Sequence, residues 1–274
     1  MEKPPSVILE AGRADRQYWH DLWRYRELFV FLAWRDLSVR YKQTAVGVAW
    51  ALVRPFITMV VFSLFGKLTN METGGVPLPI MTFAAILPWT LFSSALSESA
   101  GSLMGNSNLI SKVYFPRLIL PATSLMVCLV DFLISLAFLG VLMAWFQYWP
   151  TWRLLTLPLF TLSALLSSVA VGIWMASLTV KYRDFRVVVP FIIQFGTFIS
   201  PIAFPSSIVP EKWRLLYSFN PMVGVIDGFR WAVLGKSAEF YWPGLIVSIV
   251  LSLGLLWTGI WYFRRTEKTF ADVI

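Results

Sequence analysis

Two acidic residues, Glu98 and Asp131, lie inside long apolar segments of this chain and are its most unusual chemical groups. A carboxyl group within a membrane is costly unless it is paired or faces water, so such residues are candidates for function. A proton relay would usually need more acidic groups than these two. We therefore expect Asp131 to hold two helices together, and the alternative is that it lines a channel.

A basic and aromatic set precedes the first long apolar segment, in the stretch RYRELFVFLAWRDLSVRYKQ at 24–43. Its spacing predicts a helix over 28–43 whose apolar face turns basic, which is typical of a helix lying in the plane of the lipid headgroups. Such a helix could simply be an anchor to anionic lipid. Alternatively it is a gate that touches a phosphorylated lipid head, with charge-assisted hydrogen bonds from Arg35, Arg40 and Lys42 and a flat surface for a sugar on Tyr41.

A second polar segment, NSNLISKVYFPR at 106–117, separates two of the apolar segments. It begins with residues that favour helix N-caps and stops at Pro116, which predicts one short helix. Leu109, Ile110 and Val113 give this helix an apolar side. It is either an ordinary turn between helices or a helix that inserts into a groove on another protein.

Sequence signatures of enzymes are nearly absent. The tripeptide at 235–237, Gly-Lys-Ser, resembles the end of a phosphate-binding loop, but that motif needs glycine at position 230, where arginine stands. The chain has no G-x-S-x-G or H-E-x-x-H pattern, and His20, its one histidine, lies outside every apolar segment. With Cys128 as the sole cysteine, no disulfide forms within the chain. We expect no catalytic residue, metal site or cofactor on this chain.

The composition shows which solvent must surround these groups. Of 274 residues, 57% are hydrophobic and 14% are charged, and a soluble core of this size could not hide so much apolar surface. Lipid must cover much of it. The net charge of +8 therefore indicates basic loops beside a membrane and not a nucleic-acid partner.

Six stretches are predicted to cross the membrane, since a spanning helix needs roughly 20 mostly apolar residues. They are Val46–Leu68, Ile80–Met104, Leu118–Phe146, Leu154–Val180, Val187–Phe204 and Gly244–Phe263. The fifth is short and ends in the proline-rich run at 201–205, so we expect it to span with little tilt or to be broken near its far end. The expected fold class is an all-α integral membrane protein.

The apolar stretch 213–234 is the exception, because Asp227 and Arg230 make a simple spanning helix costly. Together with Asn220 and Pro221 it predicts a re-entrant helical hairpin between the fifth and sixth spans. Six crossings also place 17 of the 23 lysines and arginines on one side, in agreement with the positive-inside rule.

The expected layout is a single transmembrane domain over 1–274. A cytoplasmic segment at 1–27 lacks the features of a signal peptide and precedes the interfacial helix at 28–43. The six spans occupy 44–264, and a cytoplasmic tail follows at 265–274. Both ends of the chain are thus expected in the cytoplasm.

Aromatic residues within or close to the spans could stack on sugar rings, although helix packing explains them equally well. These residues are Trp50, Phe56, Trp89 and Phe92.

Several of these segments carry a resemblance to a known family. The stretches are WRDLSVRYKQTAVGVAWALVRP at 34–55, LPWTLFSSAL at 87–96, NLISKVYFPRLILP at 108–121 and FNPMVGVIDGFRWAVLG at 219–235, with further matches such as VKYRDFR at 180–186 and the terminal FRRTEKTFADVI. In these the chain resembles the membrane subunit of ABC exporters for O-antigen and capsular polysaccharides, whose Gram-positive relatives export teichoic acid. The likeness covers nearly all of the chain beyond residue 25.

The resemblance implies a homodimeric permease in the bacterial inner membrane, with two copies of a separate ATPase that holds ATP and Mg²⁺. It implies export of a glycan linked to undecaprenyl diphosphate, with a gate helix at 28–43, a coupling helix at 108–117 and outer re-entrant helices at 206–236. The residues implied to contact the ATPase are Asn108, Leu109, Lys112, Val113, Tyr114, Phe115 and Arg117. A membrane enzyme acting on lipid-linked sugars and a proton-coupled transporter remain alternatives, disfavoured by the scarcity of acidic and histidine residues.

Overall fold

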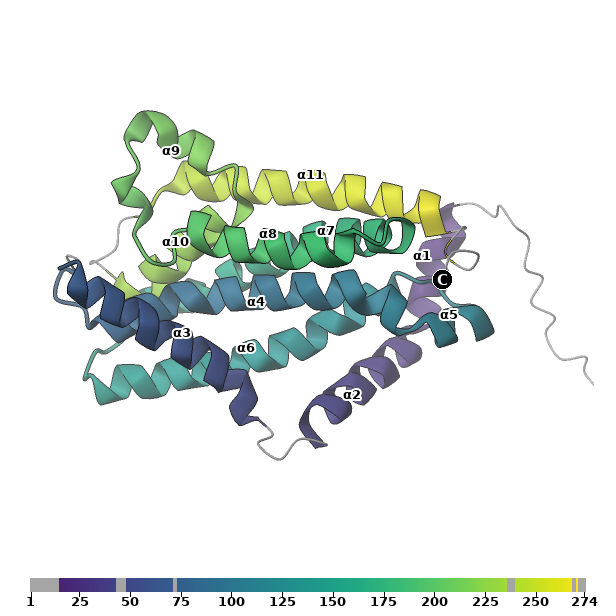
Figure 1. Ribbon diagram of the computed structural model, residues 1–274, viewed down its shortest axis with the longest axis horizontal. Helices are drawn as coiled ribbons and strands as arrows, with labels where there is room; N and C mark the ends of the chain where they lie inside the picture. The colour runs from purple at the N-terminus through teal and green to yellow at the C-terminus, as the bar shows by residue number, and fades with distance from the viewer. Residues whose placement is uncertain (1–14, 43–47, 71–72, 236–239, 268–269, 271–274) are drawn as a thin grey trace, which may run out of the picture.

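The computed structural model describes residues 15–42, 48–70, 73–235, 240–267 and 270, and all regular structure in these ranges is helical (Figure 1). The predicted all-α class is therefore confirmed for this part of the chain. Some predicted boundaries lie outside the described residues, namely Gln43 of the gate helix, Val46 of the first span, Lys236 of the hairpin, and most of the N-terminal segment and C-terminal tail.

Five helices are long and apolar enough to cross a membrane, and each overlaps one predicted span. They are α3 (Ala49–Leu68), α4 (Leu78–Gly105), α6 (Ile119–Trp145), α7 (Leu157–Lys181), which follows the 3-10 turn η1 (Trp152–Thr156), and α11 (Trp242–Thr266). The shortest has 20 residues, which at about 1.5 Å per residue matches the hydrocarbon thickness of roughly 30 Å. This multi-pass arrangement follows from length and hydrophobicity alone.

The fifth predicted span corresponds to α8 (Phe185–Ile199), which has 15 residues and a length of only about 22 Å. It lies beside α7 and α4 in Figure 1. The helix ends because Ser200 precedes Pro201, and the residue before a proline avoids the helical conformation; Ser200 is extended, with φ −76° and ψ 151°. The expected interruption near the proline-rich run is therefore present.

Helix α4 forms the centre of the bundle and packs against α3, α6, α7, α8 and α10. Most of its side chains are buried, and small residues let its neighbours come close, as is common between membrane helices. A Cβ at Gly196 of α8 would lie 2.5 Å from the ring of Trp89, and one at Gly172 of α7 would lie 2.9 Å from the Cβ of Ser99. Glycine at these two positions sets the spacing of α8 and α7 from α4.

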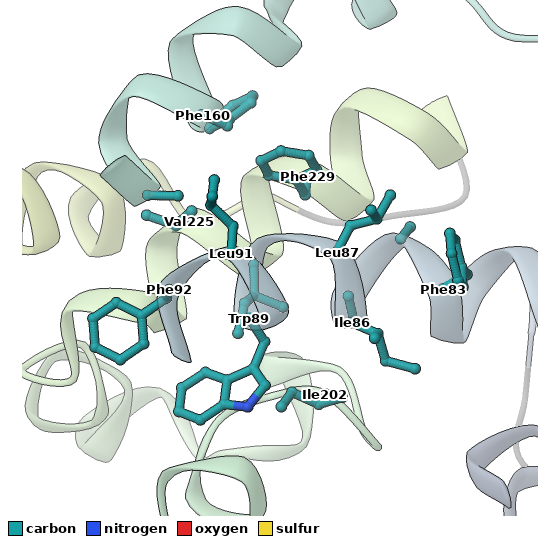
Figure 2. Packing of buried hydrophobic residues seen from close by; sticks show 14 of the residues in the cluster. Phe83, Ile86, Leu87, Trp89, Leu91, Phe92, Phe160, Ile202, Val225 and Phe229 are labelled. Atoms are coloured by element: carbon teal, nitrogen blue, oxygen red, sulfur yellow. The ribbon is translucent and has the colours of Figure 1, made fainter. Parts of the chain in front are cut away.

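The predicted hairpin region contains the short turn η2 (Ser206–Ile208), α9 (Glu211–Tyr217) and α10 (Pro221–Leu234). Local signals fix α10: the Asn220 side chain accepts a hydrogen bond of 3.0 Å from the Met222 N–H, proline occupies the first position, and Gly235 ends the helix at φ +64°. Helix α10 is buried against α4, α7 and α11, whereas much of α9 is exposed. Figure 2 shows Phe229 of α10 beside Phe160.

Different helices lie at the two ends of the bundle. Helix α1 (Asp15–Arg24), α5 (Ser107–Lys112) and the last turn of α11 gather at one end, and α9 and α10 lie at the other (Figure 1). Helix α1 was not expected from the sequence. It forms where Tyr18 and Leu22 pack against a cluster of buried residues that includes Ile110 and Phe263.

The predicted short helix at 108–117 is partly wrong. Helix α5 ends at Lys112, and Val113 is extended, with φ −132° and ψ 135°. In an extended backbone successive side chains point to opposite sides, so Tyr114 is exposed while Phe115 enters the buried cluster. Burial of Phe115 and Pro116 in the core therefore ends the helix early.

The close contact between α10 and α11 gives a test of the fold. A Cβ at Gly224 would lie 2.6 Å from the Cα and 2.7 Å from the N of Leu245, and backbone cannot move aside as a side-chain tip can. We expect Gly224→Ala to lower the free energy of unfolding by about 1–3 kcal/mol. The measurement is thermal unfolding of the purified chain in detergent.

The control is Gly254→Ala in α11, where a Cβ would meet nothing within 4 Å. An equal melting temperature for the two variants would contradict this packing.

Candidate functional site

A polar cavity of about 730 Å³ opens at the side of the bundle, between the last turn of α2 (Arg26–Lys42), the first half of α3, and the middle of α4 and α6. Its wall combines charged, hydroxyl and aromatic groups. The polar and aromatic lining residues are Arg40, Tyr41, Trp50, Arg54, Thr58, Thr90, Ser94, Ser97, Glu98, Asp131, Phe132 and Ser135. A cavity of this size and polarity between membrane-spanning helices can hold water or a polar ligand.

Arg40 links three helices at this cavity. Its Nη2 lies 2.8 Å from Oδ2 of Asp131 on α6, and its Nη1 lies 3.2 Å from Oε1 of Glu98 on α4. The hydroxyl of Tyr41 also donates a hydrogen bond to Asp131. Asp131 thus has the pairing role that we expected first, and it also lines the cavity.

Helix α2 corresponds to the predicted interfacial helix and lies at the side of the bundle. Helix α2 runs obliquely to the bundle in Figure 1, and its last turn reaches the middle of α6. Near its middle, Arg35 donates a 2.9 Å hydrogen bond to the side chain of Asn106 and pairs with Asp36, while Lys42 at its end is exposed. In this position α2 supplies Asp131, whose side chain is largely shielded from water, with a cationic partner.

The four aromatic residues proposed for the sugar path have different surroundings. Trp50 lines the cavity. Phe56 is exposed and meets Phe138 edge to face at 6.0 Å. Trp89 and Phe92 are buried in the core (Figure 2). The Trp89 Nε1 donates a 3.0 Å hydrogen bond to Thr197 of α8. In the single chain the structure therefore groups only Trp50 of the four with Asp131.

Arg54 is a cavity residue that sequence reasoning missed. It lies inside the first predicted span, and a charged residue within a span is itself a sign of function. That signal was present in the sequence and could have identified it. Glu98 is likewise a charged residue within a predicted span, and the structure shows that its partner is Arg40.

The segment around α5 presents two kinds of side chain. Val113 and Tyr114 are exposed, as are Asn108 and Lys112, so they are accessible to another protein. Phe115 is buried and Leu109 is half-buried against the same cluster. Of the residues implied to contact an ATPase, the accessible ones therefore lie mainly from Lys112 to Tyr114.

Arg117 faces the protein's own C-terminal segment. Its backbone N–H donates a 2.8 Å hydrogen bond to Oε1 of Glu267, and its guanidinium donates to the Glu267 carbonyl and lies over the ring of Phe270. Burial raises the pKa of Glu267 above its ordinary value, and the hydrogen bond from Arg117 partly offsets that rise. Arg117 thus fixes the turn to the end of α11 in this conformation.

A polar anchor joins the hairpin to the end of α8, where the proline-rich run leaves carbonyl groups without helical partners. Arg230 donates hydrogen bonds of 2.7 Å to the carbonyls of Ile202 and Phe204, and Tyr217 donates one of 2.6 Å to that of Ile199. Asp227, nearly as buried as Arg230, lies close enough to interact with it electrostatically. Both terminal nitrogens of Arg230 thus have partners within the protein, while its buried Nε has none.

No group of three or more histidine, cysteine or acidic residues that could hold a metal ion occurs in the part of the chain that the structure describes. The cavity carries two carboxylates, but Arg40 lies against both. The geometry of the cavity is suited to holding a polar ligand.

Comparison with known proteins identifies the family of this bundle. A family model for the ABC-2 type transporter matches residues 27–234. The chain belongs to this family. Its matched region begins with α2 and ends with α10, so it includes the cavity, α5 and the hairpin.

Individual relatives match over nearly their whole lengths. An O-antigen export system permease protein from Myxococcus xanthus is 28% identical over 93% of this chain and 98% of its own. A Klebsiella pneumoniae protein of the same description is 24% identical over 90% and 95%. A polysialic acid transport protein from Escherichia coli is 24% identical over 85% and 91%. The resemblance seen in the sequence is thereby confirmed, and the chain is the membrane component of an ABC-2 type transporter.

The hairpin anchor gives a test of the site's architecture. Replacing Arg230 by methionine removes two hydrogen bonds to backbone carbonyls and the positive charge facing Asp227. We expect a loss of about 3 kcal/mol or more in the free energy of unfolding, because buried polar groups would be left without partners. Thermal unfolding in detergent measures it.

Lys212→Met is the matched control, since Lys212 is an exposed cation on α9. Similar melting temperatures for the two variants would show that Arg230 does not anchor the hairpin.

Proposed function

We propose that this chain is the permease subunit of an ATP-driven exporter that moves an O-antigen-type polysaccharide, linked to undecaprenyl diphosphate, from the cytoplasm across the bacterial inner membrane. The observation that carries the proposal is the cavity at the side of the bundle, lined by Arg40, Arg54 and Trp50. Arginine suits a diphosphate and tryptophan suits a sugar face. The full-length match to O-antigen export permeases supports the same substrate class.

The proposed assembly contains two copies of this chain and two copies of a cytoplasmic ATP-binding subunit. ABC-2 permeases work with such a subunit, so ATP and Mg²⁺ belong to that partner. In this proposal the end that holds α1, α5 and the end of α11 faces the cytoplasm, α8 completes six crossings, and the hairpin enters from the outer face. The distribution of basic residues supports this orientation.

Coupling between the partner and the cavity can pass through α2. Leu32 is buried in the same cluster as Ile110 of α5, and Arg35 bonds to Asn106, the residue just before α5. Arg40 lies eight residues after Leu32 on the same helix and lines the cavity. Closure of the ATPase would displace the α5 segment, and α2 would carry that displacement to the cavity wall.

The residues of α2 have separate parts in this proposal. Arg40 and Tyr41 line the cavity and would meet the diphosphate and the first sugar. Lys42 is exposed beside them and would add positive charge at the entrance. Arg35, bonded to Asn106, would position α2 instead of contacting the substrate.

Capsular polysaccharide and teichoic acid are the alternative substrates of the same mechanism, and the match to a polysialic acid transport protein supports the first of these. Deleting the gene in its host separates the cases. Loss of polymer from lipopolysaccharide would identify O-antigen, and loss of a surface layer with intact lipopolysaccharide would identify capsule. Unchanged surface polymers of every class would overturn the proposal.

The partner surface can be tested at Val113 and Tyr114, which are 51% and 61% exposed. We expect the double variant Val113→Asp, Tyr114→Asp to retain its fold and to recover about tenfold less of the ATPase subunit, because charge in an apolar contact removes binding energy. Co-purification of the two subunits from the membrane measures this.

Tyr182→Asp is the matched control, since Tyr182 is exposed in the turn between α7 and α8. Recovery of the ATPase at the wild-type level by the double variant would show that the α5 segment is not the main contact.

A further inference from the structure

Arg40 and Tyr41 hold the last turn of α2 against α6 and α4 at the cavity. Arg40 lies 2.8 Å from Asp131 of α6 and 3.2 Å from Glu98 of α4, and Tyr41 beside it bonds to Asp131. Breaking these contacts would remove the polar attachments of this turn to the middle of both helices.

The two carboxylates differ in their surroundings. The side chain of Asp131 is 16% exposed and that of Glu98 is 52% exposed. Water screens an exposed pair and weakens it, whereas a shielded pair with good geometry holds firmly. Asp131 is therefore the main attachment of Arg40, and Glu98 is the secondary one.

We propose that Arg40, Asp131 and Glu98 form a latch that holds α2 closed over the cavity, and that a diphosphate group opens it by taking Arg40 from the two carboxylates. This inference rests on the proposed function for the identity of the ligand. Glu98 and Asp131 are positioning residues in it, because they act on Arg40 and make no contact with the substrate.

The exchange is chemically direct. A guanidinium presents the same planar fork of donors to a carboxylate and to a phosphate, so Arg40 cannot serve both in full. A diphosphate brings more negative charge than one carboxylate. When α2 moves away, water enters the opened cavity and solvates Glu98 and Asp131, which limits the cost of leaving them without Arg40.

The latch also accounts for two acids among apolar helices that serve no proton relay. An unpaired carboxylate at mid-span would be costly, and pairing with Arg40 removes that cost only while α2 is in place. The acids thus favour the closed position whenever no competing anion is present.

The chain carries its own reporter of this opening. Cys128, its sole cysteine, lines the cavity and is 1% exposed. We expect N-ethylmaleimide to label the purified full-length chain slowly in detergent. Arg40→Ala and Asp131→Asn should each be labelled at least about tenfold faster, since each releases α2.

Asp36→Asn is the matched control, because Asp36 is an acid of the same helix whose partner, Arg35, lies on that helix. It should be labelled at the wild-type rate.

The double variant Arg40→Glu, Asp131→Arg exchanges the two charges. It should return the labelling rate toward that of the wild type if the ion pair holds α2 in place, whereas a general loss of packing would leave labelling fast. Equal rates for wild type, Arg40→Ala and Asp131→Asn would overturn the latch.

The ligand step is tested on the wild-type chain with geranylgeranyl diphosphate. The diphosphate should accelerate labelling of Cys128, and geranylgeraniol at the same concentration should not. Equal rates with the two compounds would overturn the exchange. Neither measurement involves a polysaccharide or an ATPase, so the latch and the proposed export function can each fail while the other stands.

Discussion

The structure depends on one constraint: a polar group placed among apolar helices has no water to bond and must find its partner within the protein. Two arginines show how this is met. Arg40 bonds to carboxylates on α4 and α6, and Arg230 bonds to carbonyls at the broken end of α8. Each joins segments that are distant in sequence, because a charged side chain among apolar helices fixes the position of its partners.

These two polar sites lie in different parts of the bundle and have different exposure. The contacts of Arg230 are buried between α10 and the segment after α8, where the hairpin supplies donors to carbonyls without helical partners. The contacts of Arg40 border a cavity and are partly exposed. A fully buried network favours a fixed structure, and a network beside water can be exchanged for another ligand. This difference separates a structural anchor from a functional site.

Helix α2 connects the end of the bundle that holds α5 with the cavity. Its middle packs in the cluster that holds α5 and the end of α11, and its last turn lies in the cavity wall. The central helix α4 is held by close contacts at Gly172 and Gly196, which restrict sliding against α7 and α8. A packed bundle with one oblique helix at its side offers a physical route by which motion at one end reaches the cavity without rearranging the core.

The sequence by itself determined the class of the protein and most of its helices. Hydrophobic length specified α3, α4, α6, α7 and α11, because lipid requires continuous helices, and Asn220, Pro221 and Gly235 mark the ends of α10 through local backbone chemistry. The sequence also singled out Asp131, Arg40 and Tyr41 individually. Only the tertiary structure decided that they meet, that α5 ends at Lys112 so that Phe115 can be buried, and that Trp89 packs against α8. Such outcomes depend on contacts between distant segments, which neither periodicity nor propensity encodes.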